Sequence, residues 1–259
     1  MKAILGLLSL YVAACGLPAV AAGGIVQTGV EQAHFSGKPV VPRLRSGAVL
    51  VLAQDSGEPL FAKNVDQVMP IASISKLMTA MVVLDSGLPL LESIDIDKSD
   101  VDRKKGSRSK LQVGTTLMRA EMLKLALMAS ENRAAAALAR NFPGGTEAFV
   151  AAMNQKASEL GMANSHFEDP TGLTPDNVST AEDVAKMVAA AHAYPLIREY
   201  TTSDSFNIES EGKRRHRMLS YVNSNRLIKS PHQFAGKIRH RAGASGRSAG
   251  VAARVCHHW

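Results

Sequence analysis

Apolar residues occur first as short runs near the start of the chain. The run 48–53 is wholly apolar, and 59–62 follows it after a polar turn, which predicts a buried strand, a turn and a second strand. Segment 73–84 is apolar and rich in good helix formers, so we predict a core helix there. Residues 95–110 are dominated by charge and serine without a helical period, and we expect them to form an exposed excursion.

Helical spacing dominates the middle of the chain. Between residues 117 and 129 apolar positions recur three and four apart over more than half of the circumference, which predicts a buried helix. Further helices are expected over 134–140, 146–160 and 181–192, the last opened by a capping box at 179–182. Only weak strand signals follow Ser203, so strands at the start and a long helical middle predict an α+β fold.

Composition places the chain among ordinary globular proteins. Of its 259 residues 46% are apolar, 20% are charged and only 5% are aromatic, so aliphatic side chains must dominate the packing. These values exclude a disordered, collagen-like or coiled-coil chain. The length allows one large domain or two small ones.

The net charge of +7 is unevenly distributed. Residues 213–259 hold 11 Lys and Arg and no Asp or Glu, so the rest of the chain carries 19 cations against 23 acids. A basic segment could bind an anionic polymer. Its cations lack interleaved aromatic residues, however, and a solvated tail is the commoner meaning, so we expect no nucleic-acid partner.

The first 22 residues are typical of a secretory signal peptide. A lysine at position 2 precedes an apolar stretch and the small-residue run 19–22, which contains an Ala-x-Ala cleavage site. A buried N-terminal helix and a lipoprotein site before Cys15 are the alternatives. Residues 23–44 are rich in Gly, Pro and polar residues and predict a mobile lead-in.

The signal peptide determines the expected location. No later segment reaches the ~20 apolar residues of a membrane span, so we expect no transmembrane anchor and a soluble periplasmic protein. The two cysteines are Cys15 and Cys256, and removal of the first leaves no internal disulfide.

Ser73 and Lys76 form the first candidate for chemistry. Three residues apart on a helix, they share one face, and a serine at a helix N-terminus lies near the positive end of the peptide dipoles. Lys76 can act as a base only if burial among its apolar neighbours lowers its pKa from about 10.4 by roughly 3 units. Ser-x-x-Lys also occurs at Ser107/Lys110 and Ser210/Lys213, where charged surroundings should keep the lysine solvated. Otherwise Ser73 is only an N-cap beside a surface lysine.

Ser130, Glu131 and Asn132 form the second candidate, at the break between two predicted helices. Ser130 could relay a proton to a leaving amine, and Asn132 could hold a substrate amide and the Lys76 side chain. The structural alternative is a junction where Ser130 caps the next helix.

Three segments together resemble the low-molecular-mass penicillin-binding D-alanyl-D-alanine peptidases. They are 70–80 with its Ser-x-x-Lys, 130–133 with Ser-Glu-Asn, and 170–173 with Pro-Thr-Gly-Leu. The likeness runs from about residue 45 to about residue 230 and is greatest to the endopeptidases among them. It implies a β-lactamase/DD-peptidase-like fold, in which an antiparallel sheet packs with a mostly helical subdomain, and a catalytic domain over 45–233.

The resemblance also implies an activity. The chain would cleave D-Ala-containing cross-links of peptidoglycan and be acylated by β-lactam antibiotics, with Ser73 as nucleophile and Lys76 as general base. Ser130 and Asn132 would complete the proton and substrate network, and no metal or organic cofactor would be needed. A class A β-lactamase would add a glutamate for deacylation. Glu168 is the nearest candidate, in surroundings that resemble the peptidases instead.

One family feature is missing. A Lys-Thr-Gly or Lys-Ser-Gly strand should follow Ser130 by roughly a hundred residues, and the nearest string, 229–231, carries a proline that cannot donate to a β-ladder. We therefore interpret 234–259 as out-of-frame or truncated coding sequence and expect the C-terminal strands to be missing or scrambled. The alternative function is a catalytically impaired pseudo-enzyme that binds cell-wall peptide.

Overall fold

The structure is a computed structural model that describes residues 45–54, 56–103, 105–212, 215–225, 228 and 252–256. All of them belong to the compact unit Arg43–Trp259. The predicted signal peptide, the lead-in and most of the basic tail lie outside these residues. Within the described part of the chain, no helix has the length and apolar character that a membrane crossing requires.

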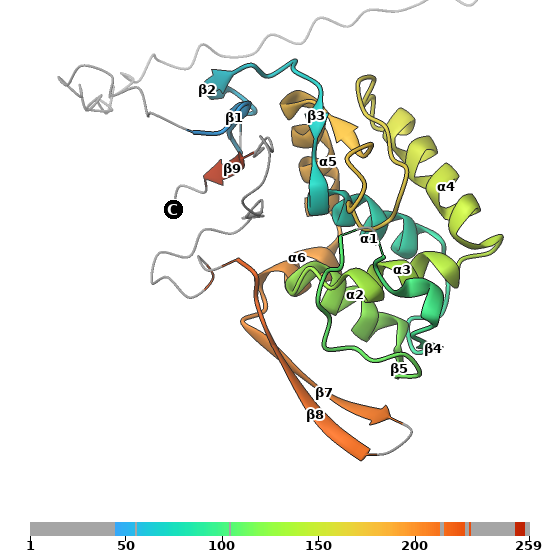
Figure 1. Ribbon diagram of the computed structural model, residues 1–259. Coiled ribbons are helices and arrows are strands. Elements are labelled where there is room, and N and C mark those ends of the chain that lie inside the picture. Colours follow the sequence, from blue (N-terminus) through green and yellow to red (C-terminus); the bar gives the residue numbers. More distant parts are fainter. Residues whose placement is uncertain are drawn as a thin grey trace, which may run out of the picture. The chain divides into compact units, whose positions relative to one another are not determined.

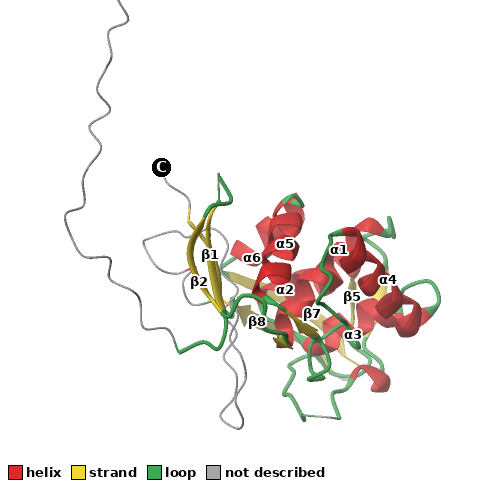
Figure 2. Cartoon of the chain, turned by 90° about the horizontal axis from the view of Figure 1, so that it is seen from above, coloured by secondary structure: helices red, strands yellow, loops and turns green. Residues whose placement is uncertain are grey.

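The first two predicted strands are confirmed. Strands β1 (Val49–Ala53) and β2 (Pro59–Lys63) pair antiparallel, with Val49 opposite Lys63, and lie side by side in Figure 2. A third strand, β9 (Ala252–Cys256), runs parallel to β1. The sequence pattern gave no signal for β9, and its direction differs from the expected antiparallel sheet. Pairing with an open strand edge depends on backbone groups and needs no side-chain period.

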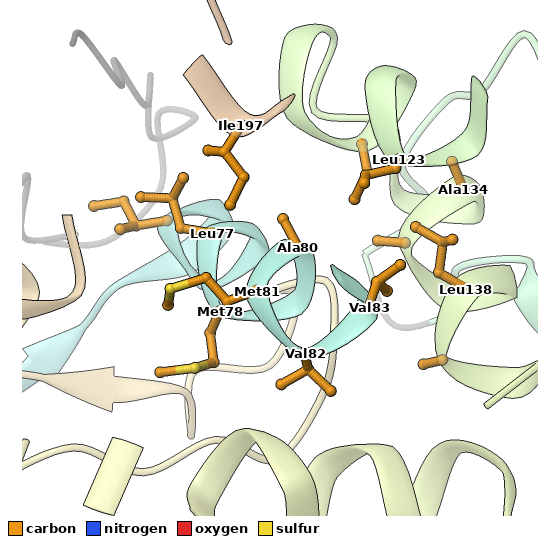
Figure 3. Close-up of a cluster of buried hydrophobic side chains, with 14 of the residues drawn as sticks. Leu77, Met78, Ala80, Met81, Val82, Val83, Leu123, Ala134, Leu138 and Ile197 are labelled. Atoms are coloured by element: carbon orange, nitrogen blue, oxygen red, sulfur yellow. The ribbon is translucent and has the colours of Figure 1, made fainter. Parts of the chain in front are cut away.

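The predicted core helix is α1 (Lys76–Asp85), preceded by the short 3-10 helix η1 (Ala72–Ser75). Every residue of α1 from Lys76 to Val83 is buried, as expected for a helix that is apolar on all sides. Figure 3 shows its side chains directed at several neighbours, among them Leu123, Leu138 and Ile197. The helix therefore gives the molecule a rigid central support.

Five further α-helices pack within the described part of this unit. They are α2 (Arg119–Met128), α3 (Asn132–Arg140), α4 (Gly145–Glu159), α5 (Ala181–His192) and α6 (Pro195–Thr202). The first four contact α1, and α6 packs on α2 and α5 (Figure 1). Helix α6 was not predicted. It begins with a proline, which suits the first turn of a helix, but the segment is short for a signal based on periodicity.

The predicted capping box at the start of α5 is wrong by one residue. Thr180 is the N-cap, and its side chain accepts a hydrogen bond from the Asp183 backbone N–H at 3.1 Å. Ser179 lies in the short strand β6 (Val178–Ser179), which pairs with β3 (Met69–Pro70), and its hydroxyl contacts that of Ser165. Because Ser179 pairs with Met69 in the β3–β6 ladder, Thr180 and not Ser179 is the N-cap of α5.

The interpretation of 95–110 as an exposed excursion is wrong in part. The segment begins at the last residue of β4 (Ser93–Asp95), which pairs with β5 (Thr116–Met118). It contains the 3-10 helix η2 (Lys98–Asp100). Ile96 is fully buried, and buried Asp100 forms an ion pair with Arg140 at 3.0 Å. The partner of Asp100 comes from forty residues away, so the local composition of the segment did not indicate it.

The strand signals after Ser203 are confirmed by a long hairpin (Figure 1). Strands β7 (Ser205–Gly212) and β8 (Arg215–Val222) pair antiparallel over eight positions. After β8, Ser224 donates through both its N–H and its hydroxyl to the Met128 carbonyl at the end of α2. This attachment brings the end of the hairpin to the α2–α3 junction.

Candidate active site

The Lys76 amine lies at the centre of the candidate site. Its Nζ is 2.9 Å from Ser73 Oγ, 2.8 Å from Asn132 Oδ1 and 2.7 Å from the Thr171 backbone carbonyl. Lys76 is only 3% exposed, whereas Ser73 is half-buried. The predicted pair therefore shares one face, with the lysine enclosed and the serine accessible.

Burial changes the proton affinity of this amine. Desolvation lowers the pKa of Lys76 from 10.5 to about 7, against the opposing effects of the Asp169 and Glu131 carboxylates, which raise it. A neutral amine has two N–H donors and one lone pair. It can donate to Asn132 Oδ1 and the Thr171 carbonyl while its lone pair accepts the Ser73 hydroxyl proton. The arrangement thus suits a general base for Ser73.

A loop with several internal hydrogen bonds supplies one of the three hydrogen-bond partners of Lys76. The Asp169 carboxylate accepts hydrogen bonds from three backbone N–H groups of the same loop, those of Thr171 (2.7 Å), Gly172 (2.5 Å) and Thr174 (2.9 Å). These bonds fix the conformation of the loop and so the position of the Thr171 carbonyl. The sequence resemblance singled out 170–173, but a backbone carbonyl has no side-chain signature that could have revealed this contact.

Two side chains attach this loop to the helical segment that carries Ser73. Thr79 on α1 donates to the Pro170 carbonyl at 2.7 Å. Asn177 donates to Ser75 Oγ at 2.9 Å, and Ser75 donates in turn to the Ala72 carbonyl at 2.8 Å. The loop and the start of α1 are therefore held as one assembly.

Gly172 makes the closest approach within this assembly. A Cβ at this position would lie 1.9 Å from the Ala72 carbonyl oxygen and 2.8 Å from the Ser73 nitrogen, and the glycine has a φ of +77°. Ala72 itself has a φ of +48°, in the left-handed region that L-residues rarely adopt. A glycine at position 172 therefore permits the close backbone contact with Ala72, the residue before Ser73.

The Ser130–Asn132 segment connects α2 to α3. Ser130 has a φ of +56°, and the Glu131 N–H bonds to the Leu125 carbonyl, a pattern that closes a helix with a left-handed residue. The N-cap of α3 is Glu131, whose side chain accepts from the Arg133 N–H at 3.3 Å. Ser130 therefore does not cap α3, and within the described part of the chain its hydroxyl makes no hydrogen bond.

Ser107 belongs to the site but was not predicted, and Glu131 was named only as part of the Ser-Glu-Asn segment, without a role of its own. Glu131 is 7% exposed; burial raises the pKa of its carboxyl, although hydrogen bonds from the Ser109 side chain and the Arg133 backbone act against this. Asn132 donates from Nδ2 to Ser107 Oγ at 2.9 Å. From the sequence, Ser107 was considered only as part of the Ser107/Lys110 pair, for which no catalytic role was expected. Its partner there, Lys110, is exposed as expected and donates to the Ser220 carbonyl.

The other sequence candidates lie away from this site or outside the described residues. Glu168 is 54% exposed and pairs with His166 at 2.6 Å, and it is not among the charges that act on Lys76. Lys213 and the string 229–231 fall outside the described residues. Among the residues that the structure does describe, no group of three His, Cys, Asp or Glu side chains could hold a metal ion.

Comparisons with known proteins show which family the chain resembles. Residues 35–237 match the family model described as D-alanyl-D-alanine carboxypeptidase. The chain is 47% identical over 193 residues to the D-alanyl-D-alanine endopeptidase of Pseudomonas aeruginosa, covering 74% of this chain and 62% of that protein. It is 48% identical over 162 residues to the Escherichia coli enzyme of the same name, covering 62% and 52%. It thus spans between half and two thirds of these relatives.

Solved structures support the fold. A variant of the DD-transpeptidase of Streptomyces strain K15 superimposes with a TM-score of 0.70 at 27% identity, over 76% of this chain and 81% of that one. The expected α+β DD-peptidase-like fold is therefore confirmed. Because the family model covers more than three quarters of the sequence, the chain belongs to the D-alanyl-D-alanine carboxypeptidase family.

Proposed function

We propose that the chain is a serine D-Ala-D-Ala peptidase that cleaves peptide cross-links in peptidoglycan through an acyl-enzyme on Ser73. One observation carries the proposal: the buried Lys76 amine lies 2.9 Å from the accessible Ser73 hydroxyl, with Asn132 and Thr171 accepting its remaining hydrogen bonds. An amine kept neutral beside a hydroxyl in a dry position can activate that hydroxyl as a nucleophile.

The chemistry follows from these positions. Ser73 transfers its proton to Lys76 Nζ as Oγ bonds to the carbonyl carbon of the D-Ala residue, and negative charge develops on the carbonyl oxygen. Backbone N–H groups, that of Ser73 among them, would stabilise this oxyanion by about 3 kcal/mol per donor. The C–N bond then breaks and the leaving amine takes a proton. Water finally hydrolyses the Ser73 ester and regenerates the hydroxyl.

Ser130 and Asn132 take the supporting roles in this proposal. Ser130 would pass the proton from Lys76 to the leaving amine. Its left-handed backbone and a hydroxyl without a hydrogen bond among the described residues are consistent with that role. Asn132 would hold the lysine through Oδ1 and the substrate amide carbonyl through Nδ2. Both residues lie at the α2–α3 junction, one on each side of the buried Glu131.

The intact protein and benzylpenicillin provide the first test. A β-lactam opened by Ser73 adds its whole mass to the chain, so mass spectrometry should show one adduct that is absent in Ser73→Ala. Lys76→Met should slow acylation about a thousandfold or more, since positioned acid–base groups contribute about 10²–10⁴. Ser158→Ala, which changes an exposed serine of α4, is the matched control and should label fully. A folded wild-type chain that gains no adduct contradicts the proposal.

The substrate class needs a second assay. The two most identical relatives quoted above are named endopeptidases, so we expect cleavage of a cross-linked muropeptide dimer to exceed release of terminal D-Ala from a pentapeptide. Chromatography of both reactions measures this ratio. Faster release of D-Ala would assign the chain to the carboxypeptidases instead.

The pseudo-enzyme alternative lacks support. The relatives are peptidases by name, and the described site retains the contacts among Ser73, Lys76 and Asn132. An impaired chain would form the adduct but leave the muropeptide dimer intact, so the same two assays distinguish it.

We further propose that the protein acts in the periplasm after removal of residues 1–22. The support is the cationic start, the apolar stretch and the small-residue run ending at Ala22. N-terminal sequencing of protein from the periplasmic fraction should begin near residue 22, and Leu7→Arg with Leu8→Arg should block export. Protein that retains Met1 and stays in the cytoplasm would overturn this assignment.

A further inference from the structure

A short loop between η2 and β5 reaches the active site. The Asp102 carboxylate accepts hydrogen bonds from the backbone N–H groups of Lys105 at 3.0 Å and Ser107 at 2.8 Å. Gly106 permits the turn with a φ of +60°. These contacts place the half-buried Ser107 side chain against Asn132, twenty-five residues further along the chain.

One N–H of the Asn132 side-chain amide has no hydrogen-bond partner among the described residues. Its Oδ1 accepts from Lys76 at 2.8 Å, and one N–H of Nδ2 donates to Ser107 Oγ at 2.9 Å. A carboxamide carries a second N–H. That N–H has no partner within the described residues, and Asn132 is half-buried, so this donor is available to a ligand.

We infer that Ser107 is a positioning residue that holds the plane of the Asn132 amide, so that Oδ1 stays on Lys76 and the second N–H is presented to the substrate carbonyl. The inference rests on the proposed function. The last side-chain torsion of asparagine is intrinsically broad, so the amide needs an external partner to define its plane. Lys76 holds only one end of it, and the Ser107 hydroxyl, carried by a loop that Asp102 braces, holds the other.

The first test is a double-mutant cycle on acylation by a penicillin. Ser107→Ala should lower the second-order acylation rate about tenfold or more, and Ser107→Thr, which keeps the hydroxyl, should restore most of it. Ser99→Ala is the matched control, because Ser99 is exposed in η2, just before the loop, and within the described residues its hydroxyl donates to Asp97 and not to Asn132. In an Asn132→Ala background, Ser107→Ala should have no further effect, because a residue that acts through Asn132 loses its effect with it. An undiminished effect in that background overturns the inference.

The second test does not depend on activity. In the free protein, NMR should show one Asn132 side-chain N–H protected from solvent exchange and the other exchanging freely. Ser107→Ala should abolish the protection and Ser107→Thr should retain it. Equal protection in wild type and Ser107→Ala would overturn the inference even if Ser73 proved unreactive, whereas failure of acylation alone would overturn only the proposed function.

Discussion

Burial gives the Lys76 side chain an unusual proton affinity. A pKa of about 7 instead of 10.5 corresponds to a bias of about 5 kcal/mol against the ammonium form. Desolvation supplies this bias, while Asp169 and Glu131 act against it. The amine is therefore close to half neutral at neutral pH, a state that an exposed lysine does not reach.

We predict that the acylation rate depends on pH through this group. Only the neutral amine can accept the Ser73 proton, so the rate should rise with pH through a midpoint near 7 and level off above it. Below the midpoint the rate should fall by about tenfold per pH unit. Stopped-flow labelling with a fluorescent penicillin between pH 5 and 9 measures the curve. A rate that does not vary over this interval would exclude Lys76 as the base.

A second prediction concerns the neighbouring carboxylate. Glu131→Gln removes a negative charge that raises the pKa of Lys76, so the midpoint of the pH curve should move to lower pH. Glutamine still offers an oxygen to the Arg133 N–H, and the helix cap should survive. Glu182→Gln, an exposed change on α5, should leave the midpoint in place. A midpoint that moves upward in Glu131→Gln would show that the charge of Glu131 does not act on the base.

Among the elements, the loop 169–174 and the start of α1 together support Ser73, the proposed nucleophile. Asp169 fixes the loop through backbone N–H groups, and Thr79 and Asn177 attach it to the segment that carries Ser73. Gly172 lies where the two backbones approach most closely. In the proposed mechanism, the position of Ser73 therefore depends on residues that take no part in the reaction.

Gly172→Ala should separate the loop from η1. Left-handed alanine costs about 1 kcal/mol, and overlap of its Cβ with the Ala72 carbonyl should add about 1–3 kcal/mol. A displacement of Ser73 of about 1 Å should slow acylation about a hundredfold. Gly87→Ala is the matched control, since Gly87 has a φ of +65° with nothing within 4 Å of its Cβ position. Denaturant unfolding and acylation rates measure both variants. Equal losses in the two would mean that the close contact has no role.

Elements with a long apolar run or a clear helical spacing of apolar residues were predictable from the sequence. Elements that depend on contacts with distant segments were not. The apolar segment at 73–84 and the periodic segment at 117–129 correspond to α1 and α2. The proline-led α6, the parallel strand β9 and the Thr180 cap were missed, because short elements and their ends depend on tertiary contacts.

At the scale of the molecule, one hydrophobic core joins the helices around α1. It includes side chains from α2, α3, α4, α5 and α6 as well as α1. Phe149 on α4 is fully buried in it and packs edge-on against Phe142, with ring centroids 5.2 Å apart. A substitution in this core should therefore lower the free energy of unfolding more than it lowers the acylation rate at Ser73.

Phe149→Ala should destabilise the fold by about 3–5 kcal/mol, the usual cost of removing a large buried aromatic side chain. Acylation by penicillin should persist wherever the variant remains folded, because the hydrogen-bond partners of Lys76 are Ser73, Asn132 and Thr171, and Phe149 is not one of them. Leu91→Ala, at a position 78% exposed, should change stability little. Urea denaturation together with penicillin labelling in native buffer measures both effects. Loss of labelling in folded Phe149→Ala would show that the core positions the site more directly than we propose.

Residue types at short, regular spacings were enough to predict the family, the helical middle and the pairing of Ser73 with Lys76. The sequence also pointed to Asn132 through the Ser-Glu-Asn motif. The packing of the elements was needed to show that Lys76 is enclosed and donates to the Thr171 carbonyl and Asn132, and that Ser107 accepts from the other end of the Asn132 amide. These contacts join residues 25 to 95 positions apart, and one of them uses a backbone carbonyl. Such pairings arise when elements pack together, so they have no signature in local composition or period.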